Sequence, residues 1–236
     1  MNRMKLGRLP ATRPYGLRMM AEYVKGRIPA PPAKISPPVF DVRVDGNDRI
    51  GDCTMAGVDH LLGAWNTLYD NPVARPDEST IESTYFGMTG GQDTGLNEAD
   101  VLKAWQQQGL FGNKIVGYAP VDPQDIRGLQ QAIAYYGAAY LGIACPESCQ
   151  EQFGQGQPWT YDPSSPIEGG HCIVAGGYDS AYVYCWTWGK IVPVTYSFFA
   201  HYLEETWCVI GPELAAAGKD TLNIDFESLE ADLPQM

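Results

Sequence analysis

The stretch GDCTMAG, residues 51–57, places a cysteine where a helical pattern begins. A helix dipole favours negative charge near its first turn, so a cysteine at this position can have a lowered thiol pKa. Because a thiolate attacks carbonyl carbon atoms, Cys53 is a candidate nucleophile. Most buried cysteines are instead inert core residues. The choice between these interpretations depends on whether the chain supplies a base close to Cys53.

The chain contains three histidines, so the search for a base is short. His60 lies seven residues along the same predicted helix as Cys53, about 10 Å away by helical rise, which is too far for proton transfer. His201 lies in SFFAHYLEE, a predicted short amphipathic helix, where packing or capping is the expected role. His171 follows IEGG and opens the predicted strand HCIVAGGY, and its neighbouring glycines allow other groups to come close. We therefore predict a Cys53–His171 pair.

Three motifs, NDRIGDCTMAG, EGGHCIVAGGYDS and CWTWGK, resemble those of the papain-like cysteine peptidases. The resemblance covers residues 45–211 and implies that Cys53 is the nucleophile and His171 the general base. It also implies that Asn47, six residues before the cysteine, replaces the usual Gln as side-chain donor to the oxyanion hole. Trp188 with the following glycine matches the Trp-Gly turn of the family. The resemblance implies no cofactor.

The position that matches the orienting Asn of the family holds Trp186, whose indole can donate a hydrogen bond but cannot accept one from the imidazole. The third member of the catalytic triad is therefore missing at its usual place. Asp179, Thr187 or a backbone carbonyl are the candidates to orient His171 instead.

Two functions follow from this resemblance. The first is a phage-type papain-like hydrolase, a peptidase or amidase, because GGQDTGLNEADVLKAWQQQGL and the region after Trp188 look similar to bacteriophage and prophage papain-like proteins. The second is a catalytically silent virion protein, a capsid or tail component whose N-terminal arm docks on partner subunits. Cys53, His171 and Asn47 favour the enzyme, whereas Trp186 and the arm favour the silent protein.

The first residues lack the apolar stretch of a signal peptide, so we expect the protein to be located in the host cytoplasm or in the virion.

The hydrophobic pattern predicts mixed helix and sheet. Met55, Val58, Leu62 and Trp65 follow a helical spacing, with Asp52 as the expected N-cap. Further helices are expected over 97–109, 123–137 and 197–205, and strands over 138–144, 171–178, 181–189 and 206–211. This order predicts an α+β, papain-like fold with an N-terminal helical half led by the cysteine helix and a C-terminal antiparallel sheet or barrel half.

Charge divides the chain into a basic start and an acidic remainder. Residues 1–34 carry a net charge of +7, whereas the other 202 residues carry −19. Such an acidic body argues against nucleic-acid binding, and no apolar run approaches the about 20 residues of a membrane span. We expect a Pro-rich extended arm over 1–44, a papain-like domain over 45–211 and an acidic peripheral tail over 212–236.

The arm is expected to extend from the domain and to dock through residues 1–40 on a second copy or on viral structural proteins. The apolar residues expected to anchor it are Leu9, Tyr15, Leu17 and Val24. Because the arm is too Pro-rich to form the helices of an inhibitory pro-segment, no such segment is predicted.

Six cysteines without a signal peptide predict free thiols in a reducing compartment. Only Cys145 and Cys149 lie close in sequence, and no second pair stands at zinc-site spacing, so no metal is expected.

Overall fold

A six-stranded antiparallel sheet runs through the computed structural model, which describes residues 3–69, 72–216 and 223–233. Its strands lie in the order β1-β6-β2-β3-β4-β5. Their bounds are β1 Gly117–Val121, β2 Ala139–Pro146, β3 Ile167–Tyr178, β4 Tyr182–Thr187, β5 Lys190–Thr195 and β6 Leu203–Ile210. The strands therefore come from the C-terminal half of the chain.

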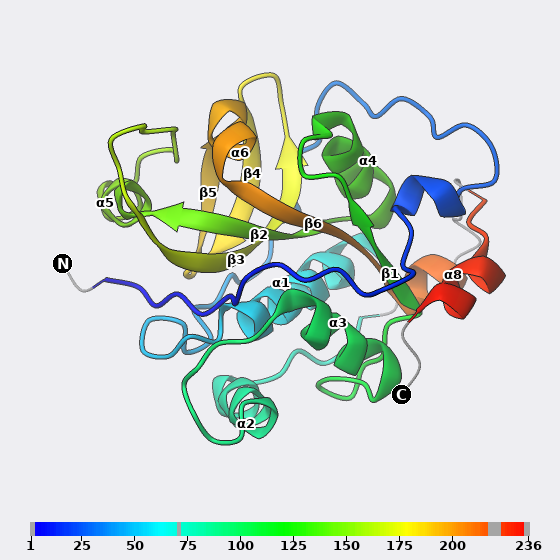
Figure 1. The fold of residues 1–236 in the computed structure, drawn as a ribbon, viewed down its shortest axis with the longest axis horizontal. Coiled ribbons are helices and arrows are strands. Elements are labelled where there is room, and N and C mark those ends of the chain that lie inside the picture. The colour runs from blue at the N-terminus through cyan, green and yellow to red at the C-terminus, as the bar shows by residue number, and fades with distance from the viewer. Residues whose placement is uncertain (1–2, 70–71, 217–222, 234–236) are drawn as a thin grey trace.

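Helices surround this sheet, and Figure 1 shows α1, α2 and α3 together on one side of it. Their bounds are α1 Cys53–Leu68, α2 Glu78–Met88, α3 Glu98–Gln107, α4 Ile126–Tyr136, α5 Glu147–Gln155, α6 Tyr196–Tyr202, α7 Pro212–Ala216 and α8 Phe226–Asp232, with a 3-10 turn, η1, over Met20–Tyr23. None of the helices in the described ranges is long and apolar enough to cross a membrane. The predicted α+β class, with a leading cysteine helix and a C-terminal sheet, is confirmed.

The first helix, α1, lies in the interior and is buried continuously from Cys53 to Trp65. A β-carbon at Gly57 would lie 2.7 Å from the Tyr140 ring and 3.0 Å from the Cys172 sulfur. Only glycine therefore lets this helix approach β2 and β3 so closely. Asp52 is the N-cap residue, as predicted, but its side chain makes no capping hydrogen bond.

Most predicted elements form close to their expected bounds. Helix α3 is capped by Asn97 and α4 by Asp125, and Gly137 ends α4 with a φ of 83°. The elements in the described ranges that the pattern did not predict are η1, α2, α5, α7, α8, β1 and β5. The strands β1 and β5 each contain a proline, Pro120 and Pro193, which weakens the strand signal in the sequence.

Residues 18–25 of the arm lie against residues 225–232 of the acidic tail. Arg18 pairs with Asp232 at 2.6 Å, and Lys25 pairs with Asp225 at 3.3 Å. Figure 1 shows the N-terminal turn η1 beside α8. The expectation that the arm extends away from the domain is wrong for its described part, because acidic groups of the same chain bind it. Docking on another subunit stays a prediction.

Among the four expected anchors of the arm, only Leu17 is fully buried, with 2% of its surface exposed. Val24 is half-buried and bridges to Ile224, whereas Leu9 and Tyr15 are exposed. The acidic tail also contributes to the core, since Leu229 is buried. The tails are therefore part of the packed domain.

The contact between β3 and Trp186 gives a test of this packing. A β-carbon at Gly176 would lie 1.9 Å from the Trp186 ring, which also packs on Phe40 with ring centroids 4.8 Å apart. We expect Gly176→Ala to lower the free energy of unfolding by about 1–3 kcal/mol, measured by urea denaturation. The matched control is Gly87→Ala in α2, where no atom lies within 4 Å of the added methyl group. A Gly176→Ala protein as stable as the control would contradict this packing.

Candidate active site

Cys53 begins α1 and lies against β3, with 1% of its surface exposed. Its sulfur accepts a hydrogen bond from the backbone N–H of Cys172 at 3.4 Å. Cys172 directly follows His171, which is fully buried. The structure therefore brings the first residue of the cysteine helix to the strand that carries the predicted base.

The imidazole of His171 is held on two sides. Its Nε2 lies 2.7 Å from the Thr187 hydroxyl, and the Trp188 indole stacks on its face with ring centroids 4.4 Å apart. Trp188 has a φ of 48° and Gly189 a φ of 76°, so the tight turn between β4 and β5 directs the indole to the histidine. Of the side chains proposed to replace the orienting Asn, Thr187 is the one that contacts His171.

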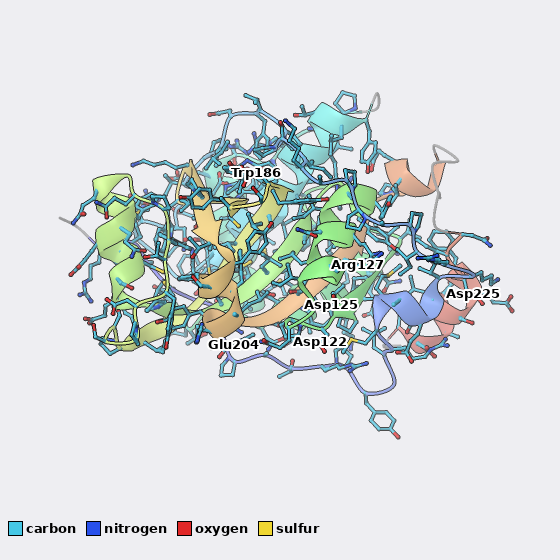
Figure 2. The ribbon with its side chains drawn as sticks, turned by 90° about the horizontal axis from the view of Figure 1, so that it is seen from above. Asp122, Asp125, Arg127, Trp186, Glu204 and Asp225 are labelled. Carbon is cyan, nitrogen blue, oxygen red and sulfur yellow. The ribbon has the colours of Figure 1, made fainter. Side chains whose placement is uncertain are left out.

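The side chains of Asp179 and Trp186 point away from His171. The Asp179 carboxylate accepts hydrogen bonds from the Tyr184 hydroxyl and from backbone N–H groups of the turn before β4. Trp186 packs on Phe40 and Gly176. Figure 2 shows Trp186 and Glu204 on opposite sides of the molecule in that view. Neither Asp179 nor Trp186 orients the imidazole in this structure.

Burial favours the uncharged forms of both reactive groups. The pKa of Cys53 is raised to about 12, chiefly by burial, although the backbone amides of Cys172 and Gly7 oppose that shift. The pKa of His171 is lowered to about 3 by burial and by the positive charge of Arg8. Its Nδ1 atom has no hydrogen-bond partner in the described part of the chain. The structure therefore favours the uncharged thiol and imidazole, and not the lowered thiol pKa that the helix start led us to expect for Cys53.

Asn47 lies in the loop that leads into α1 and is buried. Its amide nitrogen donates to the Ile50 carbonyl at 3.1 Å. The neighbouring Asp52 carboxyl has its pKa raised to about 8, chiefly by burial, and the Asn47 side chain opposes that shift. The role of Asn47 as an oxyanion donor stays a prediction.

Residues 4–9 of the arm, which we call the cleft segment, cover the cysteine. The Lys5 N–H donates to the Asn47 carbonyl at 3.0 Å, and the Arg8 N–H donates to the Gly170 carbonyl at 3.1 Å. These two acceptors come from the loop before α1 and from β3. Figure 1 shows the cleft segment, in dark blue, between α1 and β3. The segment therefore crosses the site between the elements that carry Cys53 and His171.

The loop before α3 also binds the cleft segment. The Leu9 N–H donates to the Leu96 carbonyl at 3.0 Å, and the Leu96 N–H donates to the Gly7 carbonyl at 2.9 Å. At the other end, Met4 exchanges two hydrogen bonds of 3.0 Å with the Gln150 side chain. Backbone hydrogen bonds thus fix the segment along its length, as they fix an added strand.

Glycines make this close approach possible. A β-carbon at Gly7 would lie 1.7 Å from the Gly51 carbonyl oxygen. One at Gly170 would lie 2.2 Å from the Arg8 carbonyl oxygen, and one at Gly95 would lie 2.2 Å from that of Gly7. An extended part of the arm thus covers Cys53 without forming an α-helix, an arrangement that the sequence did not predict. The sequence signal that could have shown this coverage is Gly7 followed by Arg8, in a basic arm attached to an acidic body.

Among the residues that the structure describes, no three His, Cys, Asp or Glu side chains gather closely enough to hold a metal ion. All six cysteines are free thiols and are buried.

Comparisons with solved structures identify the fold. Xylellain, a cysteine protease from Xylella fastidiosa, superposes with a TM-score of 0.68 at 17% identity, over 89% of this chain and 98% of that one. The cysteine protease and lectin-like domains of Cwp84 from Clostridium difficile give 0.57 at 12% identity, over 79% of this chain and 54% of that one. The cysteine protease CMS1MS2 of Carica candamarcensis gives 0.52 at 12% identity, over 76% and 99%.

No protein-family model and no curated protein matches the sequence. The comparisons therefore show that this chain has the fold of papain-like cysteine proteases. They do not test the predicted similarity to bacteriophage proteins.

The cleft segment makes a prediction about thiol reactivity. In the full chain, iodoacetamide should label Cys53 slowly between pH 6 and 8, because burial under the segment raises its pKa. Gly7→Ala should expel the segment and raise the labelling rate at least about tenfold, as followed by mass spectrometry of the separate cysteine peptides. Gly87→Ala is the control. Fast labelling of Cys53 below pH 7 in the unaltered chain would contradict the covered site.

Proposed function

We propose that this protein is a cysteine hydrolase that cleaves peptide or amide bonds through Cys53 and His171. The observation that carries the proposal is the hydrogen bond between His171 Nε2 and Thr187, next to a cysteine that begins a helix in a papain-like fold. Thr187 fills the role that Trp186 cannot. The nucleophile, the base and a residue that orients the base are thus all available.

The chemistry follows from one tautomer of the histidine. With its proton on Nε2, His171 donates to the Thr187 oxygen and keeps a lone pair on Nδ1. Nδ1 takes the proton of Cys53, and the sulfur attacks the carbonyl carbon of the substrate. The imidazolium then gives its proton to the leaving amine, and an acyl-enzyme remains. Water, deprotonated by the same imidazole, releases the acid and restores the thiol.

The negative oxygen of the tetrahedral intermediate needs donors. The backbone N–H of Cys53 lies in the first turn of α1, where helix amides have no carbonyl partner within the helix. The second amide hydrogen of Asn47 is the proposed side-chain donor. Together they would form the oxyanion hole.

The proposed reaction requires that the cleft segment leaves. Its departure removes the charge of Arg8 from the vicinity of His171 and admits water, and both changes raise the pKa of the imidazole. The same exposure lowers the pKa of Cys53, whose rise is due chiefly to burial. The covered form is thus the resting form of the proposed enzyme.

A catalytically silent papain-like protein, such as a virion component, is the second candidate. The observation that favours it is the pair of uncharged groups under a segment bound by several backbone hydrogen bonds. A silent protein would keep this arrangement permanently.

Covalent trapping distinguishes the two candidates. We expect the Gly7→Ala protein to react with an epoxysuccinyl peptide and to gain the mass of one inhibitor on Cys53, located by peptide mass spectrometry. Cys53→Ala should abolish the adduct. Cys172→Ala, which removes the neighbouring buried thiol but keeps the N–H that contacts Cys53, should retain it. No adduct in an uncovered protein would support the silent scaffold.

The role of Thr187 can be tested separately. Thr187→Val keeps the shape of the side chain but removes the oxygen that contacts His171, so kcat for peptide hydrolysis by the uncovered protein should fall about tenfold or more. Thr187→Ser should restore most of it. The acidic limb of the pH profile should shift in the valine variant, since the imidazolium loses a partner.

The control for Thr187 is Asp179→Asn, at the other candidate position, which should leave both kcat and the pH profile unchanged. Equal rates for the valine and serine variants would rule out the orienting hydrogen bond.

A further inference from the structure

Arg8 of the cleft segment is buried to an unusual degree for an arginine, with 2% of its side chain exposed. The side chains of Arg3 and Arg18 in the same arm are 54% and 42% exposed. The Arg8 guanidinium donates to Glu205 Oε1 at 2.8 Å and to the Ile143 carbonyl at 3.2 Å. It also pairs with Glu204. The body of the protein therefore holds a shaped pocket for this one side chain.

Two glycines shape that pocket. A β-carbon at Gly142 in β2 would lie 2.7 Å from Arg8 Cδ and 2.6 Å from Glu205 Cγ. A β-carbon at Gly170 in β3 would lie 3.2 Å from Arg8 Nε. Any other residue at either position would fill the space that the arginine occupies. We call this the Arg8 pocket, formed by Gly142, Ile143, Gly170, Glu204, Glu205 and Glu98.

The pocket also holds a second buried carboxyl group beside Glu205. Glu98, at the start of α3, is fully buried, and within the described ranges its carboxylate oxygens have no hydrogen-bond partner. Burial and the nearby Glu205 raise its pKa well above the ordinary value, whereas Arg8 opposes the rise. Trp207 donates to Glu205 Oε2 at 3.1 Å and holds that carboxylate in place. If Arg8 withdrew, the Glu205 carboxylate would remain buried without its cationic partner, at a high cost in free energy.

We propose that the Arg8 pocket is a specificity pocket that binds the arginine side chain of a peptide substrate, and that Arg8 occupies it in the covered protein. This inference rests on the proposed hydrolysis of peptides. Arginine is favoured over lysine because its planar fork can donate to Glu205 and to the Ile143 carbonyl at once. The backbone amide of Gly7 lies at the Cys53 sulfur, so the arginine of the substrate is the residue next to the one that meets the thiol.

Peptide binding without catalysis tests the pocket. The protein is the full chain with Gly7→Ala, Arg8→Ala and Cys53→Ala, so that its own segment no longer competes. The probe is a fluorescent peptide of residues 4–11, MKLGRLPA, compared by fluorescence polarisation with the same peptide containing neutral citrulline in place of its arginine. We expect the arginine peptide to bind at least about tenfold more tightly. Moving the arginine two positions along the peptide should remove the advantage.

Glu205→Gln in this background should abolish the preference for arginine over citrulline. The substitution removes the charge but keeps an oxygen that can accept from Trp207. Glu78→Gln on α2 is the matched control and should keep the preference. Equal binding of the two peptides to a folded protein, or an unchanged preference in Glu205→Gln, would overturn the pocket.

The failure of this inference can be told from failure of the proposed hydrolysis. A preserved arginine preference without covalent trapping at Cys53 would refute the hydrolase and leave a guanidinium-binding site. If the triple variant does not fold, the single Gly7→Ala protein serves instead, with epoxysuccinyl peptides that carry arginine or citrulline. Trapping at least about tenfold faster with arginine is the expected result, and equal rates would overturn the pocket.

Discussion

The close approach of α1 to β3 is the contact on which the rest of the site depends. Gly57 lets the helix pack against Tyr140 and Cys172 at distances that no side chain would allow. Cys53, four residues earlier, is thereby held against the strand that begins its buried stretch at His171. This packing and the cleft segment together bury both groups, and burial is the largest influence on both pKa values. The steric constraint thus sets the geometry of the proposed catalytic pair, and the burial disfavours the ionised forms of Cys53 and His171.

The sequence predicted the elements that carry the site because their signals are local. Helix α1 has its apolar spacing, α3 and α4 have capping residues, and the glycines around His171 mark a place of close approach. The choice of Thr187 over Asp179 was not predictable in this way. It depends on the turn before β4, whose N–H groups bind the Asp179 carboxylate, and on the positive φ of Trp188 at the other end of that strand. Spacing along a chain does not contain that information.

The path of the arm was also beyond local signals. The described part of the arm is extended apart from the 3-10 turn η1 and contains no α-helix, as its prolines lead one to expect. The sequence contains no pattern that identifies the binding partner of the arm. The partner is a set of backbone groups, such as the carbonyls of Asn47, Leu96 and Gly170, which every residue possesses. Charge asymmetry correctly indicated attraction between the arm and an acidic surface. It could not show that this surface belongs to the same chain, as the pairs of Arg8 and Arg18 do.

In the proposed enzyme, the Arg8 pocket joins inhibition to specificity. The cleft segment stays in place through backbone hydrogen bonds that any peptide could form, together with one buried ion pair that only a cationic residue could replace. A competing peptide that lacks arginine would regain the backbone bonds but would leave Glu205 and Glu98 without a positive partner. A peptide with arginine would satisfy both requirements and could exchange with the segment at little net cost. In this scheme, the substrate that fits the pocket best is also the one that most readily uncovers Cys53, so recognition and activation depend on the same carboxylates.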